Sequence, residues 1–576
     1  MKYIMRVNVR TRSVSVQEAR GEELRWGGRS FIAHTLLNEV PPTCEPLGRK
    51  NKLIFASGLL ADTNLTTSGK ISIGGKSPLT GGVKESNTGG WAGKRLARLG
   101  LRAVIIEDLP DRRMTDVLVI TAEGARLDPA PDLAGKMVED TIAYLREKYG
   151  RKIGIFCIGP AGEMLMAGAG IASPDEYDEQ IRYAARGGIG ALMGSKGLKA
   201  VVVDDTGATY KPEAHDEAEL RNLIRWTANE LAVDAKTRNR NLYGTLDILK
   251  DVNTFGMLPT RNFSQGTFDG AEQLTGPAVR ELILSRGGKT GKPCVPGCTI
   301  QCSSVFPDEK GRRIVATMQY ESLVLLGPNC GIGDPQDIAE LNALCNQVGI
   351  DAMETGVAIG VAMEAGVIPF GDAEGAKDLI RQIGRGTWLG RILGNGAEVT
   401  GRCLGVRRVP AIKGQAIPAY DPRALKGNGV TYTTSPMGAD HTAGNAFETR
   451  NTHDPLSSEG QIEISMRLQV RAALLDTLGV CIFIRPPFAK RPEMMANILK
   501  ARFGWDLTVQ QMNGIGFDCV MTEREFNRRA GVSEEFRPIP EFMREEPLPP
   551  KNSVFDVPEE KMLHIWEHYV PSPDQF

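Results

Sequence analysis

The chain of 576 residues is 41% hydrophobic and 24% charged, with a formal net charge of −1. This length predicts two to four domains, and the balanced charge gives no indication of a nucleic-acid or membrane-surface partner. The first residues lack the apolar stretch of a signal peptide, and no run of about 18 apolar residues is present. We therefore expect a soluble cytoplasmic protein, in which clustered cysteines are metal ligands or redox groups more often than disulfides.

Residues 1–208 are predicted to be β-rich. Short β-branched runs bounded by turns predict strands at residues 3–9, 52–56, 103–107, 118–120 and 200–203. Many of the 65 glycines lie in short runs beside Ser, Thr, Lys or Arg, and such turns are expected at residues 67–70, 74–82, 86–91 and 186–190. Backbone without Cβ atoms can approach a large anionic ligand closely, so these turns predict cradles for phosphate groups.

From about residue 209 the apolar periodicity becomes helical. Helices are predicted at residues 217–229, 242–252 and 334–348, the last with Asp334 as its N-cap and Gly349 at its end. The acidic tail after about residue 535 is expected to wrap over the surface, and no internal repeat is detected. The predicted fold class is α+β, with a β-rich domain at 1–208 and two mainly α-helical domains at 209–405 and 406–576.

Three of the ten cysteines lie within nine residues, Cys294-Val295-Pro296-Gly297-Cys298-Thr299-Ile300-Gln301-Cys302. The proline and the glycine predict a tight loop that turns the three thiols toward one point, where they can hold a metal ion or an iron–sulfur cluster. The spacing alone leaves both zinc and a cluster open. Cys481, which follows a predicted helix, is a credible fourth thiolate.

Two segments share the pattern Asp or Asn, two residues, Gly, one residue, Asp or Cys. They are Asn346-Gln347-Val348-Gly349-Ile350-Asp351 and Asp476-Thr477-Leu478-Gly479-Val480-Cys481. Each is predicted to end a helix, which leaves free backbone groups and a side-chain acceptor suited to hydrogen-bonding a polar heterocycle. Each segment alone is equally consistent with an ordinary helix cap.

Glu321 lies in an otherwise apolar run and is expected to be buried. A buried carboxyl group is either paired or has a raised pKa, the usual state of a catalytic acid or base. A purely structural Glu321 that caps backbone or meets an arginine is an equal alternative. His441 is one of only six histidines, although a histidine in a loop is more often solvated than catalytic.

These pieces together resemble the aldehyde:ferredoxin oxidoreductase family, the tungsten enzymes with a bis-pterin cofactor and one [4Fe–4S] cluster. The resemblance runs nearly end to end. Nine collinear blocks carry it: Lys76-Ser77-Pro78-Leu79-Thr80-Gly81, Asn87-Thr88-Gly89-Gly90, Gly159-Pro160-Ala161-Gly162-Glu163, residues 186–196, the cysteine loop, Tyr320-Glu321-Ser322, Gly349-Ile350-Asp351, Pro418-Ala419-Tyr420-Asp421-Pro422-Arg423 and residues 476–481.

The resemblance implies a β-rich base for the pterins, covered by two mainly helical domains. It also implies roles for particular residues. Pterin or phosphate contacts fall to Lys70, Asn87, Gly89, Arg186 and Gly187, and the two pterin motifs supply Asn346, Gly349, Asp351, Asp476 and Gly479. Cys294, Cys298, Cys302 and Cys481 would hold the cluster, and Glu321 and His441 would lie beside the metal. Magnesium would bridge the pterin phosphates.

The chain departs from the family pattern at several positions. The loop has an extra residue between Cys294 and Cys298, Lys70 replaces an arginine and so loses the bidentate fork, and Asn346 replaces an aspartate. Glu340 could be the carboxylate of the family's dimer-interface iron, but no histidine lies between His215 and His441, so this iron site is expected to be absent.

Cys330 stands nine residues after Glu321. The tungsten subunit of the dearomatising benzoyl-CoA reductases, in the same family, is similar in placing a thiolate on the metal. A small buried free thiol is an equal alternative.

The leading prediction is an oxidoreductase that oxidises aldehydes to carboxylic acids and passes electrons to a ferredoxin or an iron–sulfur subunit. A low-potential reductase of an aromatic acyl-CoA and a non-catalytic iron–sulfur subunit are the alternatives. The choice between tungsten and molybdenum stays open, because pterin sulfurs hold the metal. We expect an oligomer without a membrane span or nucleic-acid partner.

Overall fold

The computed structural model describes residues 1–112, 114–532 and 539–572. Its first 203 residues form two six-stranded sheets, in the orders β2-β1-β6-β3-β4-β5 and β11-β10-β9-β12-β7-β8. The strands are β1 (Tyr3–Asn8), β2 (Ser13–Glu18), β3 (Leu53–Ser57), β4 (Ile71–Lys76), β5 (Val83–Thr88), β6 (Leu101–Glu107), β7 (Asp116–Thr121), β8 (Gly124–Pro129), β9 (Gly154–Cys157), β10 (Ile171–Pro174), β11 (Ile181–Ala184) and β12 (Leu198–Val203).

The two sheets have the same connectivity. In the first, β1 pairs antiparallel with β2 and parallel with β6; in the second, β7 pairs antiparallel with β8 and parallel with β12. One helix precedes the third strand and another precedes the last strand in both sheets. The prediction that the chain has no internal repeat is therefore wrong at the level of topology. The sequence hides the repeat because buried strands need only apolar, β-branched character, which many unrelated sequences satisfy.

All five predicted strands are present, as β1, β3, β6, β7 and β12. The expected turn at 74–82 is too long, because Gly74 and Gly75 lie inside β4. A Cβ atom would lie 2.4 Å from the Lys84 carbonyl oxygen of β5 at Gly74 and 2.4 Å from the Lys52 carbonyl oxygen, just before β3, at Gly75, so close packing explains these glycines. The expected turn at 86–91 is also wrong in its first part, since Ser86 to Thr88 complete β5. The sequence predicts a turn here because Ser86 and Asn87 are residue types that are frequent in turns.

The rest of the chain is mainly helical, with two small sheets. The helices are α1 (Gly28–Glu39), α2 (Ala92–Arg98), α3 (Val138–Tyr149), α4 (Pro160–Glu163), α5 (Ile189–Ser195), α6 (Glu217–Val233), α7 (Ala235–Tyr243), α8 (Leu249–Thr254), α9 (Gly276–Ser285), α10 (Tyr320–Leu326), α11 (Pro335–Val348), α12 (Ala352–Glu364), α13 (Ala373–Arg385), α14 (Trp388–Gly394), α15 (Ala397–Leu404), α16 (Lys426–Thr434), α17 (Gln461–Leu478), α18 (Arg485–Lys490), α19 (Glu493–Phe503), α20 (Val509–Arg529), α21 (Glu541–Glu545) and α22 (Glu559–Leu563). The small sheets contain β13 (Lys289–Lys292), β14 (Ser303–Pro307) and β15 (Arg313–Val315), and β16 (Ala411–Ile412) with β17 (Gln415–Ala416).

The predicted helix at 334–348 is confirmed as α11. The Asp334 side chain accepts hydrogen bonds from two backbone N–H groups of its first turn, and Gly349 ends the helix at φ 75°. The predicted single helix at 242–252 is wrong. Gly244 adopts φ 62° directly after α7, which breaks the chain into two shorter helices.

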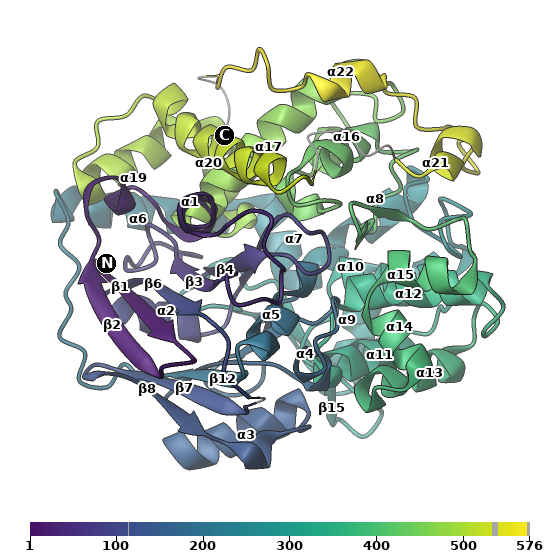
Figure 1. The fold of residues 1–576 in the computed structure, drawn as a ribbon. Coiled ribbons are helices and arrows are strands. Elements are labelled where there is room, and N and C mark those ends of the chain that lie inside the picture. Colours follow the sequence, from purple (N-terminus) through teal and green to yellow (C-terminus); the bar gives the residue numbers. More distant parts are fainter. Residues whose placement is uncertain (113, 533–538, 573–576) are drawn as a thin grey trace.

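The α+β fold class is confirmed, and Figure 1 shows the N-terminal strands on the left and below, with α11 to α15 on the right and α17, α20 and α22 above. The proposed divisions at 208 and 405 stay predictions. No single helix in the described ranges is long and apolar enough to cross a membrane; the bent pair α17 and residues 482–490 passes on length and composition alone, and α17 is mostly buried within the protein.

The C-terminal tail is more than a surface wrap. Phe542, Met543, Leu548, Phe555 and Trp566 are all buried in the largest hydrophobic core. The prediction for this tail is therefore wrong over these residues, because apolar side chains spaced through a Pro-rich segment can anchor it without regular helical periodicity. Residues 533–538 of the predicted tail lie outside the described residues.

Candidate active site

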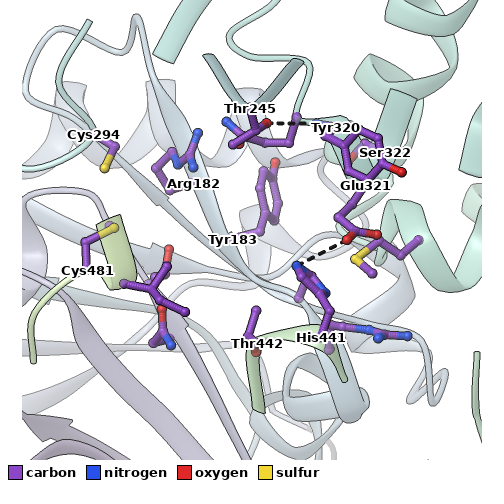
Figure 2. Close-up of a pocket in the computed structure, with 18 of the residues that line it drawn as sticks. Arg182, Tyr183, Thr245, Cys294, Tyr320, Glu321, Ser322, His441, Thr442 and Cys481 are labelled. Carbon is purple, nitrogen blue, oxygen red and sulfur yellow. Dashed lines mark hydrogen bonds and ion pairs between the residues drawn. The ribbon is translucent and has the colours of Figure 1, made fainter. Parts of the chain in front are cut away.

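The edge strands β5 and β11 of the two sheets contact each other, and a cavity of about 420 Å³ opens between the sheets and the helices. In Figure 2, Cys294 and Cys481 lie on one side of this cavity and Glu321 and His441 on the other, with Tyr183 between them. The predicted site residues that line it are Lys70, Asn87, Gly89, Arg186, Asn346, Asp351, Asp476, Glu321, His441, Cys294, Cys302 and Cys481. Gly187, Gly349, Gly479, Cys298 and Cys330 are not in the lining.

At one end of the cavity Glu321 meets His441. Glu321 lies in the first turn of α10 and is 8% exposed. One carboxyl oxygen, Oε2, accepts a hydrogen bond of 2.7 Å from the backbone N–H of Ala419, and Oε1 lies 3.3 Å from Nε2 of His441 (Figure 2). Burial raises the pKa of Glu321, and the nearby His441 and the Ala419 N–H offset part of that rise. The expected burial of Glu321 is confirmed, and its surroundings suit a proton-transfer group.

A second carboxyl group stands on the other side of His441. Asp440 Oδ1 lies 4.0 Å from His441 Nδ1, while Asp440 Oδ2 accepts a hydrogen bond of 2.6 Å from the buried ammonium of Lys84. Burial would raise the pKa of Asp440, but the positive charges around it, Lys84 first, lower the pKa overall. Gly187 allows this arrangement, because a Cβ atom there would lie 2.4 Å from Lys84 Cγ. The alternative of a solvated loop histidine is not favoured.

Arg186 is held by the protein itself. Its Nε donates to Asp351 Oδ2 at 3.2 Å, and its two terminal nitrogens donate to the carbonyl oxygens of Ala439 at 2.8 Å and Ala416 at 2.7 Å. A guanidinium that is this fully engaged joins three chain segments around the cavity. Its predicted contact with a cofactor is therefore additional to a structural role.

The two helix ends found in the sequence make equivalent contacts with the two sheets. Gly349 ends α11 at φ 75° and Gly479 ends α17 at φ 74°. A Cβ atom on Gly349 would lie 2.6 Å from the backbone nitrogen of Gly159, and one on Gly479 would lie 2.6 Å from Cα of Gly58. Gly58 follows β3 and Gly159 follows β9, which are corresponding strands. Each helix end therefore packs directly on a glycine of its own sheet.

The residue two positions after each glycine differs in chemistry. Asp351 is the N-cap of α12 and accepts a hydrogen bond of 3.0 Å from the Met353 N–H. Cys481 also precedes a helical turn, and its N–H donates to Oγ1 of Thr67 at 3.1 Å. One backbone position thus carries a carboxylate in one half and a thiol in the other.

Asp476 belongs to a half-buried chain of polar side chains. Asn87 Nδ2 donates to Asp476 Oδ1 at 3.0 Å, and Lys70 donates to the Asn87 amide oxygen. Arg29 lies 3.5 Å from Asp476 and forms two hydrogen bonds with Glu523, of 2.7 and 2.8 Å. Burial raises the pKa of Asp476 to about 6, against the lowering effect of Arg29 and Lys70. This chain fixes the orientation of three predicted binding residues.

The cysteine loop runs from the end of β13 to the start of β14 without helix or strand, which confirms the predicted loop. Gly90 donates a hydrogen bond of 2.8 Å to the carbonyl oxygen of Cys294, and a Cβ atom on Gly89 would lie 2.8 Å from that oxygen. Burial, and then the charges of Cys294 and Cys481, raise the pKa of Cys302 to about 12.

The distances between the four thiols can be compared with those of a zinc site. Among the described residues, no three of the four thiols Cys294, Cys298, Cys302 and Cys481 have sulfur atoms all within 4.8 Å of one another. A tetrahedral zinc ion with Zn–S bonds of about 2.3 Å needs sulfurs roughly 3.8 Å apart. The thiols as placed are therefore farther apart than a tetrahedral zinc site requires, and the iron–sulfur cluster stays a prediction.

Cys330 lies in the hydrophobic core and is fully buried. Its Sγ points to the carbonyl oxygens of Leu325 and Gly356, each at 3.4 Å, and burial raises its pKa to about 12. Since Cys330 does not line the cavity, this geometry favours the alternative of a buried free thiol over a metal ligand.

Glu340 belongs to an acidic cluster with Asp337 and Glu374. The ammonium of Lys377 lies 2.8 Å from Asp337, 2.6 Å from Glu340 and 2.8 Å from Glu374. The chain's own cation therefore balances these carboxylates. The predicted absence of an iron site there stays a prediction.

Sequence reasoning missed several polar residues of the cavity. Besides Glu321 and His441, five of the described lining residues have a buried polar atom without a hydrogen-bond partner, at Glu85 Oε1, Thr88 Oγ1, Arg240 Nε, Asp247 Oδ1 and Gln319 Nε2. Glu85 and Thr88 could have been predicted as site residues, because they lie on the same strand as Asn87, Val83–Thr88. The other three come from separate loops and helix ends, which only the fold brings together.

An acid–base pair and a group of thiols at opposite ends of one polar cavity are typical of a redox enzyme that binds a large cofactor. The family model described as "Aldehyde ferredoxin oxidoreductase, N-terminal domain" matches residues 4–205, and the model of "domains 2 & 3" matches residues 222–569. The chain belongs to the aldehyde ferredoxin oxidoreductase family, as the sequence resemblance predicted.

Curated relatives agree with this assignment. The chain is 31% identical to the tungsten-containing aldehyde ferredoxin oxidoreductase of Pyrococcus furiosus, covering 95% of this chain and 91% of the relative. It is 32% identical to the protein of the same description from Thermococcus kodakarensis, with 95% and 91% covered. The WOR-like subunit of an aliphatic sulfonate oxidoreductase from Pyrococcus furiosus is 25% identical, with 87% and 81% covered.

Among solved structures, the fold is similar to the active site complex BamBC of benzoyl coenzyme A reductase in complex with 1,5-dienoyl-CoA. The TM-score is 0.77 at 19% identity, and the match covers 92% of this chain and 89% of that chain. At this identity the likeness concerns the fold alone.

Proposed function

We propose that this chain is a tungsten or molybdenum bis-pterin oxidoreductase that oxidises aldehydes to carboxylic acids. Electrons would leave through a [4Fe–4S] cluster to a ferredoxin or an iron–sulfur subunit. The observation that carries the proposal is the single cavity with Glu321 and His441 at one end and Cys294 and Cys481 at the other. Family membership supports an oxidoreductase, and a cytoplasmic location fits the ten cysteines, which are all free.

The residues present fit a large polar cofactor. Among the described residues, several that line the cavity have buried polar atoms without a hydrogen-bond partner, and Gly89 in the lining packs closely on Cys294. Lys70 donates a hydrogen bond to the Asn87 amide oxygen. Its positive charge would attract the phosphate groups of the cofactor. The residues that would hold the pterins are Lys70, Asn87, Gly89, Arg186 and Gly187, with Asn346, Gly349 and Asp351 at one helix end and Asp476 and Gly479 at the other.

The four cysteines fit the cluster. Cys294, Cys298 and Cys302 come from one loop and Cys481 from a distant helix end, and three of the four are buried. Buried thiols with raised pKa values become thiolates when they bind iron, and the cluster then occupies the space that they surround. The proposed direction of electron flow is from the cavity through this loop to the partner.

The reaction adds one water to an aldehyde and releases a carboxylic acid, two protons and two electrons. The bound metal would supply Lewis-acid polarisation of the carbonyl group and take up the electron pair. Glu321 would accept the proton from the attacking water at a carboxylate oxygen, because a raised pKa makes that carboxylate a stronger base near neutral pH. His441 would donate a hydrogen bond from Nε2 to the carbonyl oxygen as negative charge develops there.

Aromatic side chains fix this end of the cavity. The Tyr320 hydroxyl donates to the carbonyl oxygen of Ala419 at 2.5 Å, and the N–H of the same residue binds Glu321. The Tyr420 ring packs at a tilt against Tyr320, at 5.2 Å between ring centroids, and against Phe447, at 5.7 Å. This wall excludes water around Glu321 and provides an apolar surface for the carbon chain of an aldehyde.

Anaerobic assay of the metal-loaded protein with a viologen dye and a panel of aldehydes tests the proposal. We expect dye reduction with at least one aldehyde, and loss of that reduction in Glu321→Gln. Absence of turnover with every aldehyde, in protein shown to contain metal and pterin, would exclude the proposed activity.

A second candidate is a low-potential reductase of an aromatic acyl-CoA, supported by the fold likeness to the benzoyl coenzyme A reductase complex. The position of Cys330 does not support it, because this thiol faces backbone carbonyls in the core. X-ray absorption at the metal edge distinguishes the two: pterin sulfurs alone are expected for the aldehyde oxidase, and an additional thiolate would favour the reductase.

A further inference from the structure

Glu85 is a buried carboxyl group with no assigned role. It lies on β5, the edge strand of the first sheet, and it lines the cavity although only 4% of the residue is exposed. Its Oε1 has no hydrogen-bond partner within the part of the chain that the structure describes. A buried oxygen left unpaired is destabilising, so a ligand group that pairs with it would remove that penalty.

The neighbours of Glu85 do not satisfy this oxygen. Burial, and then the charge of Asp476, raise the pKa of Glu85 to about 8, against the lowering effect of the Arg29 charge and of a hydrogen bond from Ser72. Arg29 binds Glu523 through Nε and Nη2, at 2.7 and 2.8 Å, and its Nη1 forms no hydrogen bond with any described residue, Glu85 included. A neutral carboxyl group beside the Asp476 carboxyl offers both an acceptor and a donor, so the two groups together match a ligand that carries both.

Glu85 also lies close to the predicted binding residues of the same half. It is two residues before Asn87 on one strand, so both side chains leave the same face of β5. Asn87 in turn donates to Asp476 at 3.0 Å. Glu85, Asn87 and Asp476 therefore present acceptors and donors at one end of the cavity.

We propose that Glu85 binds the cofactor directly, with Oε1 accepting a hydrogen bond from a ring N–H or exocyclic amine of the polar heterocycle beside Asp476. This inference rests on the proposed function, because the heterocycle is the pterin. The ligand class is a nitrogen heterocycle with adjacent N–H donors and a carbonyl acceptor. The carboxyl groups of Glu85 and Asp476 can bind both kinds of group along one edge of the ring.

The test compares Glu85→Leu and Glu85→Gln with the control Asp116→Leu. Asp116 is also a buried carboxyl group with an unpartnered oxygen, but it lies on β7 and does not line the cavity. Each variant is purified in parallel, its folding is verified by circular dichroism, and its pterin content per chain is measured by the fluorescence of acid-released, oxidised pterin.

We expect Glu85→Leu to retain about tenfold less pterin than the parent, as loss of one hydrogen bond to a carboxyl group implies. Glu85→Gln and Asp116→Leu should retain the parent's content, because glutamine still has an acceptor and Asp116 is remote. Parent-like pterin content in folded Glu85→Leu would overturn the inference. A parent protein without pterin would instead contradict the proposed function.

An infrared measurement keeps the inference testable if Glu85→Leu does not fold. The protonated carboxyl band that disappears in Glu85→Gln is assigned to Glu85 and compared between cofactor-loaded and cofactor-free parent protein. A shift of this band on loading is expected from direct contact. An unchanged band would overturn the inference.

Discussion

The two sheets and their helix ends form two halves with one backbone plan and different side chains. In the first half α17 ends at Gly479 against Gly58, and in the second α11 ends at Gly349 against Gly159. The first half then presents the thiol of Cys481, whereas the second presents a carboxylate that binds Arg186. The shared backbone suits two similar ligand groups. The differing side chains give one half a thiol and the other half a carboxylate.

The position three residues before each glycine shows the same divergence. Asp476 in the first half is a buried carboxyl group with a raised pKa beside Glu85. Asn346 in the second half is an amide, which does not titrate. Backbone geometry therefore duplicates the framework, while single side chains make the halves electrostatically unequal.

The largest expected effect is a difference in iron content between variants of Cys481 and Asp351, which lie two residues after Gly479 and Gly349. Cys481→Ala should reduce the iron content per chain to a small fraction of the parent's, because it removes one of four thiolates. Asp351→Ala should leave the iron content unchanged and destabilise the fold, since Arg186 loses a buried partner. Iron and acid-labile sulfide analysis measures both. Equal iron loss in the two variants would break the distinction between the halves.

Changes at the other end of the cavity should act on turnover alone. Glu321→Gln should lower kcat about 10²- to 10⁴-fold, the usual contribution of a general base, with little change in iron content. Steady-state kinetics with dye and aldehyde, together with metal analysis, provide the check. Turnover within twofold of the parent would show that Glu321 has only a structural role.

The helix-end glycines should tolerate no side chain. Gly479→Ala and Gly349→Ala should each lower the free energy of unfolding by about 3 kcal/mol, because the left-handed backbone and the contact with a sheet glycine both oppose a Cβ atom. Gly366→Ala is the matched control: its φ is 75°, but a Cβ atom there has no neighbour within 4 Å. Denaturant unfolding should show a smaller loss for this control, and equal losses would mean that the sheet contacts contribute nothing.

The smallest expected effect is on the pH dependence of stability, through Glu85 and Asp476 of the first half. Glu85 and Asp476 have pKa values of about 8 and 6, above those of unfolded carboxyl groups. Such groups bind protons more tightly when folded, so their stabilisation is complete below about pH 4 and is lost as the pH rises through 6 to 8. Replacing both by Gln and Asn should reduce this fall. Unfolding curves between pH 5 and 9 measure it; an unchanged pH slope would contradict the raised pKa values.

Many features of the two halves and of the site can be predicted from the sequence. The family blocks, α11 with its caps, the cysteine loop and the buried Glu321 follow from local patterns, because caps, turns and apolar runs depend on neighbouring residues. The repeated sheet topology does not, since buried strands need only apolar character. The roles of Glu85, Lys84 and Asp440 depend on contacts between distant segments, which no local pattern encodes.

The most direct test of the central claim is the cofactor stoichiometry of the purified protein. If one cavity joins a pterin-bound metal to a cluster at the four cysteines, each chain should contain tungsten or molybdenum, pterin, and about four iron atoms. Metal analysis with pterin fluorescence measures all three. Iron or zinc without tungsten, molybdenum or pterin would contradict the account and favour a non-catalytic subunit.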